Sequence, residues 1–379
     1  MSQDFVRRLP QASFARPGPD GLGAGIHLDI PLVLLLMVLS AYGLLILYIA
    51  VGANPGPVTA QAVRVGIGFA VMIVIAQISP VVFLRSAPWL FVAGLALLLA
   101  VSVVGTDVNG SRRWLRIPGI ASFQPSELMK LVVPLLIAWY LHDRHLPPKG
   151  KHIFWALALI FVPVILIYRQ PDLGTSLLIA ASGLLVVFLA GVGWRYLIGA
   201  GGLALLASPA LWFLLREYQR ERILTMFNPE RDPLGAGWNT IQAKTAIGSG
   251  GLFGKGLFEG TQSQLDFLPE SQTDFIMAVL AEELGLVGVV GLLLLYILIT
   301  GRGAIIAVQA QDTFGRLLAG SVTFTFFVYV FVNIGMVSGV LPVVGVPLPL
   351  VSYGGTSIVT LFAGFGILMS IHTHRRITL

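Results

Sequence analysis

The sequence predicts an all-α polytopic membrane protein with about ten transmembrane helices, and three observations support this fold class. Of the 379 residues, 56% are hydrophobic and only 11% are charged, whereas a soluble protein carries about 25% charged residues. Uninterrupted apolar stretches of about 20 residues, the length that crosses a bilayer, recur along the whole chain. These stretches lack the alternating polarity of membrane β-strands, so helices are the expected spanning elements.

The apolar stretches define ten predicted helices. In chain order they span residues 28–52, 61–79, 87–104, 122–141, 153–168, 173–191, 196–213, 274–300, 315–339 and 353–371. Residues 28–379 are therefore expected to form a single membrane domain. Residues 1–27, rich in arginine and proline, predict a disordered cytoplasmic tail without the cleavage site of a signal peptide.

The distribution of basic residues predicts the orientation in the membrane. Twelve of the 24 lysines and arginines fall in segments that are cytoplasmic if the N-terminus is inside: Arg7, Arg8, Arg16, Arg85, Arg144, Lys149, Lys151, Arg195, Arg302, Arg316, Arg375 and Arg376. Because cytoplasmic loops are enriched in Lys and Arg, this pattern favours an N-in, C-in topology. The seventh and eighth helices are then joined by one large extracytoplasmic loop of about residues 214–273, which can translocate regardless of its charge.

Composition and spacing exclude several classes of function. The chain has no cysteine, which excludes disulfides, thiol catalysis and Cys-ligated metals. The net charge of +6 does not indicate a nucleic-acid partner, because the positive-inside distribution explains half of the basic residues. The glycine-rich stretch around Lys255 fails the spacing of an ATP-binding P-loop, since Ser249 and Gly256 stand where Gly and Ser or Thr belong. The large loop is instead interpreted as a mobile or re-entrant lid.

The first external connection, residues 105–121, breaks the positive-inside rule. Its stretch GSRRWLR places Arg112, Arg113 and Arg116, together with Trp114, on the outer side. One interpretation is contact with the phosphate headgroups of membrane lipid. The other is recognition of an anionic substrate at the outer face, because arginine binds phosphate with a planar fork.

Two ionisable side chains lie inside the predicted fourth helix. If Pro125 begins this helix, Glu127 lies in the first turn and Lys130 lies on the same face, about 4.5 Å deeper. An ionised group near the bilayer centre costs at least about 2.5–3.5 kcal/mol, so such groups face protein or a wet cavity. Either the two form a self-neutralising structural pair, or Lys130 is presented to an anion in a cavity that opens outward.

Further acids have alternative interpretations. Asp172 follows a Gln-Pro pair at the outer start of a helix, where capping is at least as good an explanation as function. Asp274 is either a helix cap or a general base, because partial burial raises a carboxylate's pKa and suits proton abstraction. Glu282 and Glu283 point about 100° apart, so at least one is expected to bond to a neighbouring helix. Both are interpreted as structural or as part of a lipid path.

The stretch PVVGVPLPLVSYGGTS, residues 342–357, cannot form a regular span because of its prolines and glycines. Irregular backbone at membrane depth is tolerated where it lines a cavity or is buried in protein. Uncharged hydrogen-bonding groups in and near this stretch are supplied by Asn333, Ser338, Ser352, Tyr353 and Ser357.

Several long motifs carry a family resemblance. They are FQPSELMK, QPDLGTS, DPLGAGW, IGSGGLFGKG, TQSQLDFLPESQTDFIMAVLAEELGLVG, FVNIGMVSGVLPVVGVPLPLVSYGGTS and SIHTHRR. From about residue 28 onward the chain resembles the SEDS family (shape, elongation, division and sporulation), and most of all its rod-shape branch. The motifs are long and keep a common order, so an accidental match is implausible.

The resemblance implies a ten-helix membrane glycosyltransferase that polymerises lipid II into glycan strands at the outer face of the cytoplasmic membrane. It also implies a class B penicillin-binding protein, a transpeptidase, as partner, together with elongation-complex scaffold proteins. The family's invariant acid corresponds to the aspartate of TDF. The implied site residues are Asp274 for catalysis, with Arg113, Trp114, Glu127, Lys130 and Asp172 for substrate binding.

This implication agrees with the residue chemistry. Lipid II needs an apolar groove for its polyprenyl tail, cations for its pyrophosphate and a base near its sugars, and the sequence places all three in one outer layer. Two alternatives remain open: a lipid II flippase, which needs polar residues through the full membrane depth, and a non-catalytic scaffold for the transpeptidase. No ligand set has the spacing of a metal site, so the need for a divalent cation, Mg or Mn, is left open, as is the direction of glycan growth.

Overall fold

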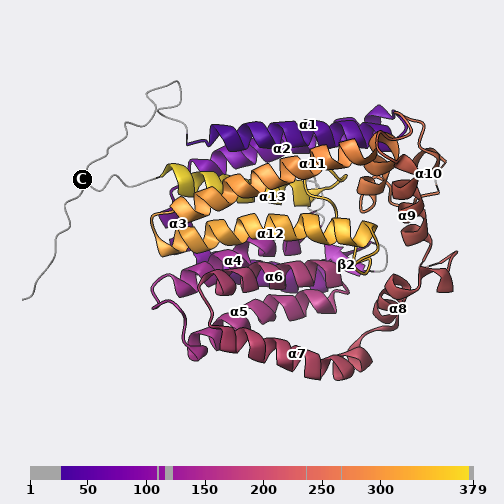
Figure 1. The fold of residues 1–379 in the computed structure, drawn as a ribbon. Helices are drawn as coiled ribbons and strands as arrows, with labels where there is room; N and C mark the ends of the chain where they lie inside the picture. The colour runs from indigo at the N-terminus through magenta and orange to yellow at the C-terminus, as the bar shows by residue number, and fades with distance from the viewer. Residues whose placement is uncertain (1–26, 109–110, 116–122, 236, 266, 375–379) are drawn as a thin grey trace, which may run out of the picture.

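The structure, a computed structural model, describes residues 27–108, 111–115, 123–235, 237–265 and 267–374. The long helices run side by side as a bundle, with the shorter elements gathered at one end (Figure 1). The start of the first helix and the end of the last lie together at the opposite end, where the His27 and His374 rings stack at 3.8 Å. The rest of the predicted tail and Arg116 lie outside the described residues.

Ten helices of 17 residues or more occur in the described chain, and each overlaps one predicted range. They are α1 (Ile30–Ala50), α2 (Pro55–Ala76), α3 (Pro80–Val104), α4 (Pro125–Leu141), α5 (Gly150–Arg169), α6 (Leu173–Leu189), α7 (Trp194–Leu214), α11 (Ile276–Gln309), α12 (Thr313–Val337) and α13 (Thr356–Thr373). By length and composition, seven of the described helices can cross a membrane. The all-α polytopic class is confirmed, while ten crossings with both termini inside remain a prediction.

Two helix starts were predicted too late. α2 begins at Pro55 instead of residue 61, and α3 begins at Pro80 instead of residue 87. Both have proline in the first turn, where its missing N–H costs nothing, and Asn54 caps α2 by accepting from the Gly56 amide. The prolines and glycine at the start of α2, and Arg85 and Pro88 near the start of α3, interrupt the apolar runs, so hydropathy alone places both starts too late.

A short antiparallel hairpin, which the sequence did not predict, fills the first external connection. It pairs β1 (Thr106–Val108) with β2 (Ser111–Trp114), and Leu115 pairs with Phe123 beyond it. The Leu115–Phe123 bridge brings the end of β2 close to the start of α4. The hairpin therefore fixes where Arg113 and Trp114 stand relative to that helix.

α4 lies inside the bundle, in contact with α3, α5, α6, α12 and α13. Its two charged residues are buried: Glu127 is 6% exposed and Lys130 is 8% exposed. Because protein surrounds this helix, both charges are kept away from lipid, as ionised groups in a bilayer require.

The large loop contains several helices, so the expectation that it lacks regular structure is wrong, while its role as a mobile or re-entrant lid stays a prediction. It contains α8 (Glu217–Phe227), a 3-10 turn η1 (Pro229–Arg231), α9 (Trp238–Gly250) and α10 (Thr261–Gln264). α9 packs against α11, and α10 contacts both α9 and α11. The second half of the loop is therefore fastened to the bundle.

The fastening includes an exchange of backbone hydrogen bonds where α11 breaks. Gly285 has φ 65° and ψ −161°, so two helical bonds around it cannot form. The glycine-rich segment of residues 251–256 supplies the missing partners on both sides of the break, which leaves the four backbone groups satisfied. The four bonds are Lys255 N to Glu282 O (3.0 Å), Gly256 N to Glu283 O (3.2 Å), Leu286 N to Gly251 O (3.0 Å) and Val287 N to Leu252 O (3.1 Å).

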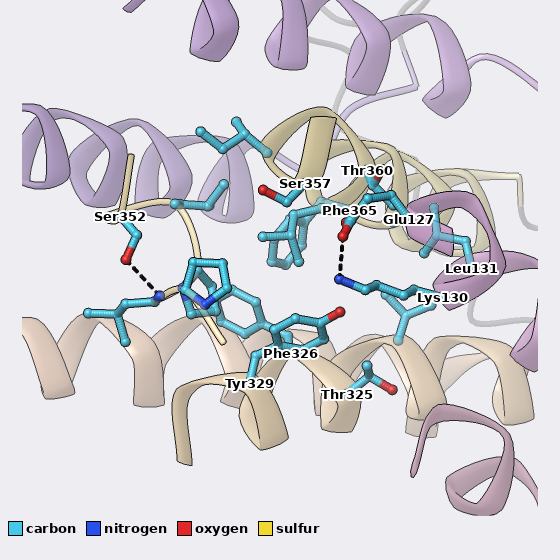
Figure 2. A pocket seen from close by; sticks show the side chains of 18 residues that line it. Glu127, Lys130, Leu131, Thr325, Phe326, Tyr329, Ser352, Ser357, Thr360 and Phe365 are labelled. Atoms are coloured by element: carbon cyan, nitrogen blue, oxygen red, sulfur yellow. Dashed lines mark hydrogen bonds and ion pairs between the residues drawn. The ribbon is translucent and has the colours of Figure 1, made fainter. Parts of the chain in front are cut away.

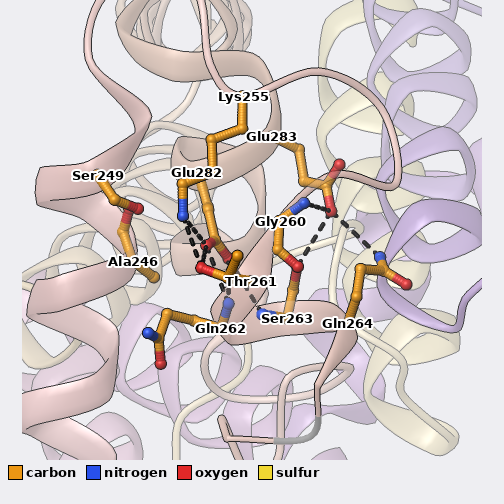
Figure 3. Close-up of polar contacts among 10 residues, drawn as sticks. All are labelled: Ala246, Ser249, Lys255, Gly260, Thr261, Gln262, Ser263, Gln264, Glu282 and Glu283. Atoms are coloured by element: carbon orange, nitrogen blue, oxygen red, sulfur yellow. Dashed lines mark hydrogen bonds and ion pairs between the residues drawn. The ribbon is translucent and has the colours of Figure 1, made fainter.

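The side chains of Glu282 and Glu283 hold the loop between Lys255 and Ser263 (Figure 3). Glu282 accepts from Lys255 Nζ at 2.7 Å and from the amides of residues 262 and 263 at the start of α10. Glu283 accepts from the Gly260 amide and from the Ser263 hydroxyl. Both acids hold structural contacts, and the expected bond to a neighbouring helix is confirmed, because Gln262 and Ser263 belong to the short helix α10.

Substitution of Gly285 by alanine is expected to destabilise the protein by more than about 2 kcal/mol. A Cβ at this position would stand 2.3 Å from Gly254 N, and a left-handed φ disfavours an L side chain. Thermal unfolding of the purified protein measures the effect. Gly291→Ala, on the same helix, is the matched control, because a Cβ added there would meet no other atom within 4 Å. Equal midpoints for the two variants would contradict the account of the break.

Candidate active site

A cavity of about 630 Å³ lies at the end of the bundle that carries the hairpin and the loop helices. Its walls come from β2, the starts of α4 and α6, α8, the turn before α11 and parts of the segment 344–357. All of the site residues named from the sequence line this one cavity: Arg113, Trp114, Glu127, Lys130, Asp172 and Asp274. The fold therefore brings together groups that are up to 161 positions apart (274 − 113).

Glu127 and Lys130 form the predicted pair on α4. Lys130 Nζ donates to Glu127 Oε1 at 2.7 Å, and it lies 5.0 Å from the centre of the Tyr329 ring. The same pair also lines a smaller pocket of about 40 Å³, whose lining residues are drawn in Figure 2. The smaller pocket also contains Thr325, whose buried hydroxyl has no partner in the described chain. The Glu127 carboxylate thus largely compensates the lysine charge.

Arg113 is held against the wall by the connection between α5 and α6. Its Nε donates to the Gln170 carbonyl at 3.1 Å, and its Nη2 donates to the Pro171 carbonyl. Its Nη1 lies 3.5 Å from Asp172 Oδ2. Asp172 also caps α6, because its Oδ1 accepts from the Thr175 amide at 3.1 Å. The capping interpretation of Asp172 is therefore confirmed, and it coexists with a place in the cavity wall.

Hydrogen bonds to its carbonyl groups hold the backbone segment that carries Asp274. Three consecutive carbonyls in the turn before α11 each accept a hydrogen bond from α12 or from the irregular segment that follows it. Such bonds fix the position of a side chain that is itself free to meet a ligand. The three bonds run from Asn333 Nδ2 to Asp274 O (2.9 Å), from Ser352 Oγ to Thr273 O, and from Tyr353 N to Gln272 O (2.8 Å).

The Asp274 carboxylate faces the cavity and does not cap the helix. α11 begins at Ile276 with Phe275 as N-cap and no side-chain cap bond, so the capping interpretation is wrong. Burial is the main cause that raises the pKa of Asp274 to about 6; the negative charge of Glu270 adds to it, and the positive charge of Arg222 opposes it. A carboxylate with this pKa is ionised at neutral pH and basic enough to accept a proton.

Four further wall residues come from the large loop and were missed by sequence reasoning: Tyr218, Arg222, Glu270 and Thr273. Tyr218 and Arg222 lie four residues apart on α8, and Glu270 lies in the turn before Asp274. The Arg222 guanidinium lies 5.7 Å from the centre of the Tyr218 ring. The spacing of Tyr218 and Arg222 signals a shared helix face, but nothing in the sequence says which way that face points.

The residues expected around the proline-rich segment divide into two groups. Tyr353 and Ser357 line the cavity. Asn333 and Ser352 act behind the wall, where they hold backbone carbonyls. Ser338 donates to a carbonyl in the last turn of α12 and does not line the cavity.

The described residues contain no group of three or more acidic or histidine side chains arranged to hold a metal ion. Two of the four carboxylates that line the cavity are paired with basic side chains. The geometry therefore assigns no residues to a divalent cation.

The fold and the cavity define a class of protein: a multi-pass helical membrane protein with a polar, charge-lined cavity at one end of the bundle. The chain belongs to the FtsW/RodA/SpoVE family of cell cycle proteins, whose family model matches residues 29–377. This match confirms the resemblance that was inferred from the motifs, because SEDS is another name for the same family.

Similar sequences agree with this membership. Peptidoglycan glycosyltransferase MrdB of Escherichia coli (strain K12) is 53% identical over 352 residues, which are 93% of this chain and 95% of that protein. The probable peptidoglycan glycosyltransferase FtsW of Geobacter metallireducens is 38% identical over 323 residues, which are 83% of this chain and 84% of that protein.

Solved structures confirm the fold and the rod-shape branch. The rod shape determining protein RodA of Thermus thermophilus matches with a TM-score of 0.69 and 32% identity, over 92% of this chain and 98% of that one. A second solved structure is described as "Structural coordination of polymerization and crosslinking by a peptidoglycan synthase complex". One of its chains matches with a TM-score of 0.80 and 35% identity, over 91% of this chain and 97% of that one.

Proposed function

We propose that this chain is a peptidoglycan glycosyltransferase of the RodA type that polymerises lipid II during cell elongation. It resides in the cytoplasmic membrane with its cavity facing the periplasm. The observation that carries the proposal is the convergence of Asp274, Glu127 and Lys130 on one cavity. The names of the relatives support the reaction class.

Asp274 acts as the general base. Its carboxylate accepts the proton from the 4-hydroxyl of the acceptor's N-acetylglucosamine, and that oxygen attacks C1 of the donor's N-acetylmuramic acid with inversion. The bond from C1 to the diphosphate oxygen breaks, and its electron pair leaves on undecaprenyl pyrophosphate. The pinned backbone of Asp274 supports this role, because a base must be held within hydrogen-bond reach of the proton that it removes.

Lys130 and Arg113 provide positive charge for the pyrophosphate. A carboxylate lies beside each of them, at 2.7 Å for Lys130 and 3.5 Å for Arg113. A phosphate oxygen can compete with Glu127 or Asp172 for these donors and so gain a charge-assisted hydrogen bond. Because each cation has a carboxylate partner, the protein does not bear the cost of an uncompensated buried cation. Trp114 lies beside Arg113 on the same wall and supplies an apolar surface for a sugar or for the first isoprenyl units.

The partner is a class B penicillin-binding protein, which cross-links the new strands. The similarity to a chain of a peptidoglycan synthase complex supports a synthase partnership of this kind. Elongation-complex scaffold proteins are expected to join the same assembly.

The test is glycan polymerisation by the purified chain with its transpeptidase partner and labelled lipid II, measured as a function of pH. Because the base must be ionised and the pKa of Asp274 is raised to about 6, the rate is expected to rise from pH 5 to 7 and then level off. Below pH 6 the logarithm of the rate should fall by about one for each pH unit, as for a single protonation. A rate that is flat between pH 5 and 7 would remove Asp274 as the base.

A flippase is the competing interpretation, and the polar groups of the described chain argue against it. Arg64 of α2 lies 4.6 Å from the centre of the ring of Tyr353, which lines the cavity, and so belongs to the region of the cavity wall. Glu282 and Glu283 are bonded to the loop. The flippase would be favoured over the polymerase if the purified protein moved lipid II across vesicle membranes and formed no glycan polymer in the assay above.

A further inference from the structure

The charged groups of the cavity are not equally available to a ligand. Three cations and four carboxylates line it: Arg113, Lys130, Arg222, Glu127, Asp172, Glu270 and Asp274. Two cations lie within 4 Å of a carboxylate, namely Lys130 with Glu127 at 2.7 Å and Arg113 with Asp172 at 3.5 Å. Within the described chain, Arg222 is in no ion pair of this length.

Arg222 is presented by α8 in a form suited to an anion. It is partly buried, and its guanidinium lies 5.7 Å from the ring centre of Tyr218, one helical turn earlier. Stacking on an aromatic ring restricts the guanidinium without using its N–H groups. The side chain therefore keeps its planar donor fork available at the cavity wall.

We propose that Arg222 binds the diphosphate of a lipid-linked glycosyl substrate from the loop side of the cavity. This inference rests on the proposed function and adds a phosphate contact that the sequence did not identify. A planar fork of N–H donors matches two phosphate oxygens, and charge-assisted bonds of this kind are the strong ones. Arg113 and Lys130 already have internal partners, so Arg222 is the cation that gains most when a diphosphate arrives.

Proton transfer to Asp274 makes the contact of Arg222 with a phosphate more favourable as the reaction proceeds. Glu270 and Asp274 are the acids of the wall that have no basic partner within 4 Å in the described chain. When the acceptor's proton moves to Asp274, that carboxyl becomes neutral, and at the same time the departing diphosphate gains negative charge. The attraction of Arg222 then shifts from Asp274 to the phosphate oxygens, which stabilises the transition state more than the ground state.

The position of Arg222 also gives the large loop a role in substrate binding. α8 lies in the first half of the loop, and the second half is fastened to α11 through Glu282 and Glu283. The loop therefore supplies one phosphate contact, while the bundle supplies the proton acceptor.

The test is equilibrium binding of radiolabelled undecaprenyl diphosphate to the full chain in phosphatidylcholine nanodiscs. Arg222→Gln is expected to raise the Kd about tenfold, which corresponds to about 1.4 kcal/mol, and Arg222→Lys to raise it less. Undecaprenol, which lacks phosphate, should bind equally to all three proteins. Arg231→Gln is the matched control, because it removes the same charge from an exposed residue of η1 that does not line the cavity. Thermal unfolding checks that each variant is folded.

Several results would overturn the inference. Unchanged affinity of both Arg222 variants for undecaprenyl diphosphate would do so. So would a loss of affinity for undecaprenol as large as that for the diphosphate, which would indicate an apolar or structural role. If the Arg222 variants lost as much affinity for phosphatidylglycerol as for undecaprenyl diphosphate, Arg222 would be a general contact for lipid headgroups. If Arg222 served only as counter-ion of Asp274, its substitution would have no effect on Kd in the Asp274→Asn background, whereas a phosphate contact predicts the same tenfold loss there.

The outcome is separable from that of the proposed function. Diphosphate binding that depends on Arg222, in a wild-type protein that makes no glycan polymer, would support the inference and reject the polymerase. Polymer formation by the wild type, together with wild-type affinity in Arg222→Gln, would reject the inference alone.

Discussion

Substitution of Asp274 by asparagine is expected to lower the rate of glycan polymerisation by about 10²- to 10⁴-fold, the usual contribution of a general base. Asparagine keeps the shape of the side chain but cannot accept the proton of the 4-hydroxyl. The three hydrogen bonds that pin this turn involve backbone carbonyls of residues 272–274, so the local structure should persist. The measurement is polymer formed from labelled lipid II with the partner transpeptidase present.

The control for Asp274→Asn is Glu221→Gln, which removes an exposed carboxylate of α8 outside the cavity. It should polymerise at the wild-type rate. Thermal unfolding and partner binding of Asp274→Asn should match the wild type, which separates lost chemistry from lost structure. Normal polymerisation by a folded Asp274→Asn protein would end the assignment of the base.

The second large effect concerns stability at the Glu127–Lys130 pair. Glu127→Gln or Lys130→Met alone leaves one charge buried without its partner, and each should destabilise the protein by about 3–5 kcal/mol. The double variant removes both charges, so its stability should return close to that of the wild type. Thermal unfolding of the four proteins completes a double-mutant cycle.

Activity decides whether this pair is only structural. The double variant should fold but polymerise poorly, because the cavity has lost a cation for the pyrophosphate. Lys151→Met, at an exposed position in the first turn of α5, should change neither stability nor activity. A stable double variant with wild-type polymerisation would show that Glu127 and Lys130 only neutralise each other.

Some of the site was predictable because the membrane makes charge expensive. Glu127 and Lys130 lie three residues apart in an apolar helix, and this spacing together with the cost of an isolated charge predicts a buried pair. Asp274 was predictable as a candidate for a similar reason, since it is a carboxylate at the edge of a long apolar run. Its capping alternative failed because α11 begins two residues later than expected, at Ile276.

Arg222 and the partners of Glu282 could not be predicted in this way. Arg222 lies in a polar helix of the loop, where charge costs little and so carries no signal. Glu282 bonds to Lys255, which is 27 positions earlier in the chain (282 − 255), and such a contact is visible only after the loop folds back on α11. The break at Gly285 was equally hidden, because a glycine in an apolar run is compatible with a continuous transmembrane helix.

The sequence by itself determined that this protein is a polytopic helical bundle, which helices carry buried charge, and which family it resembles. The first two properties follow from the cost of exposing polar backbone and charge to lipid, which acts on each segment separately. The family resemblance follows from long motifs in a common order. Only the tertiary structure decided which charges are paired, where the loop attaches and which side chains share the cavity. Those outcomes depend on distances between segments far apart in the chain, and hydropathy and spacing carry no information about such distances.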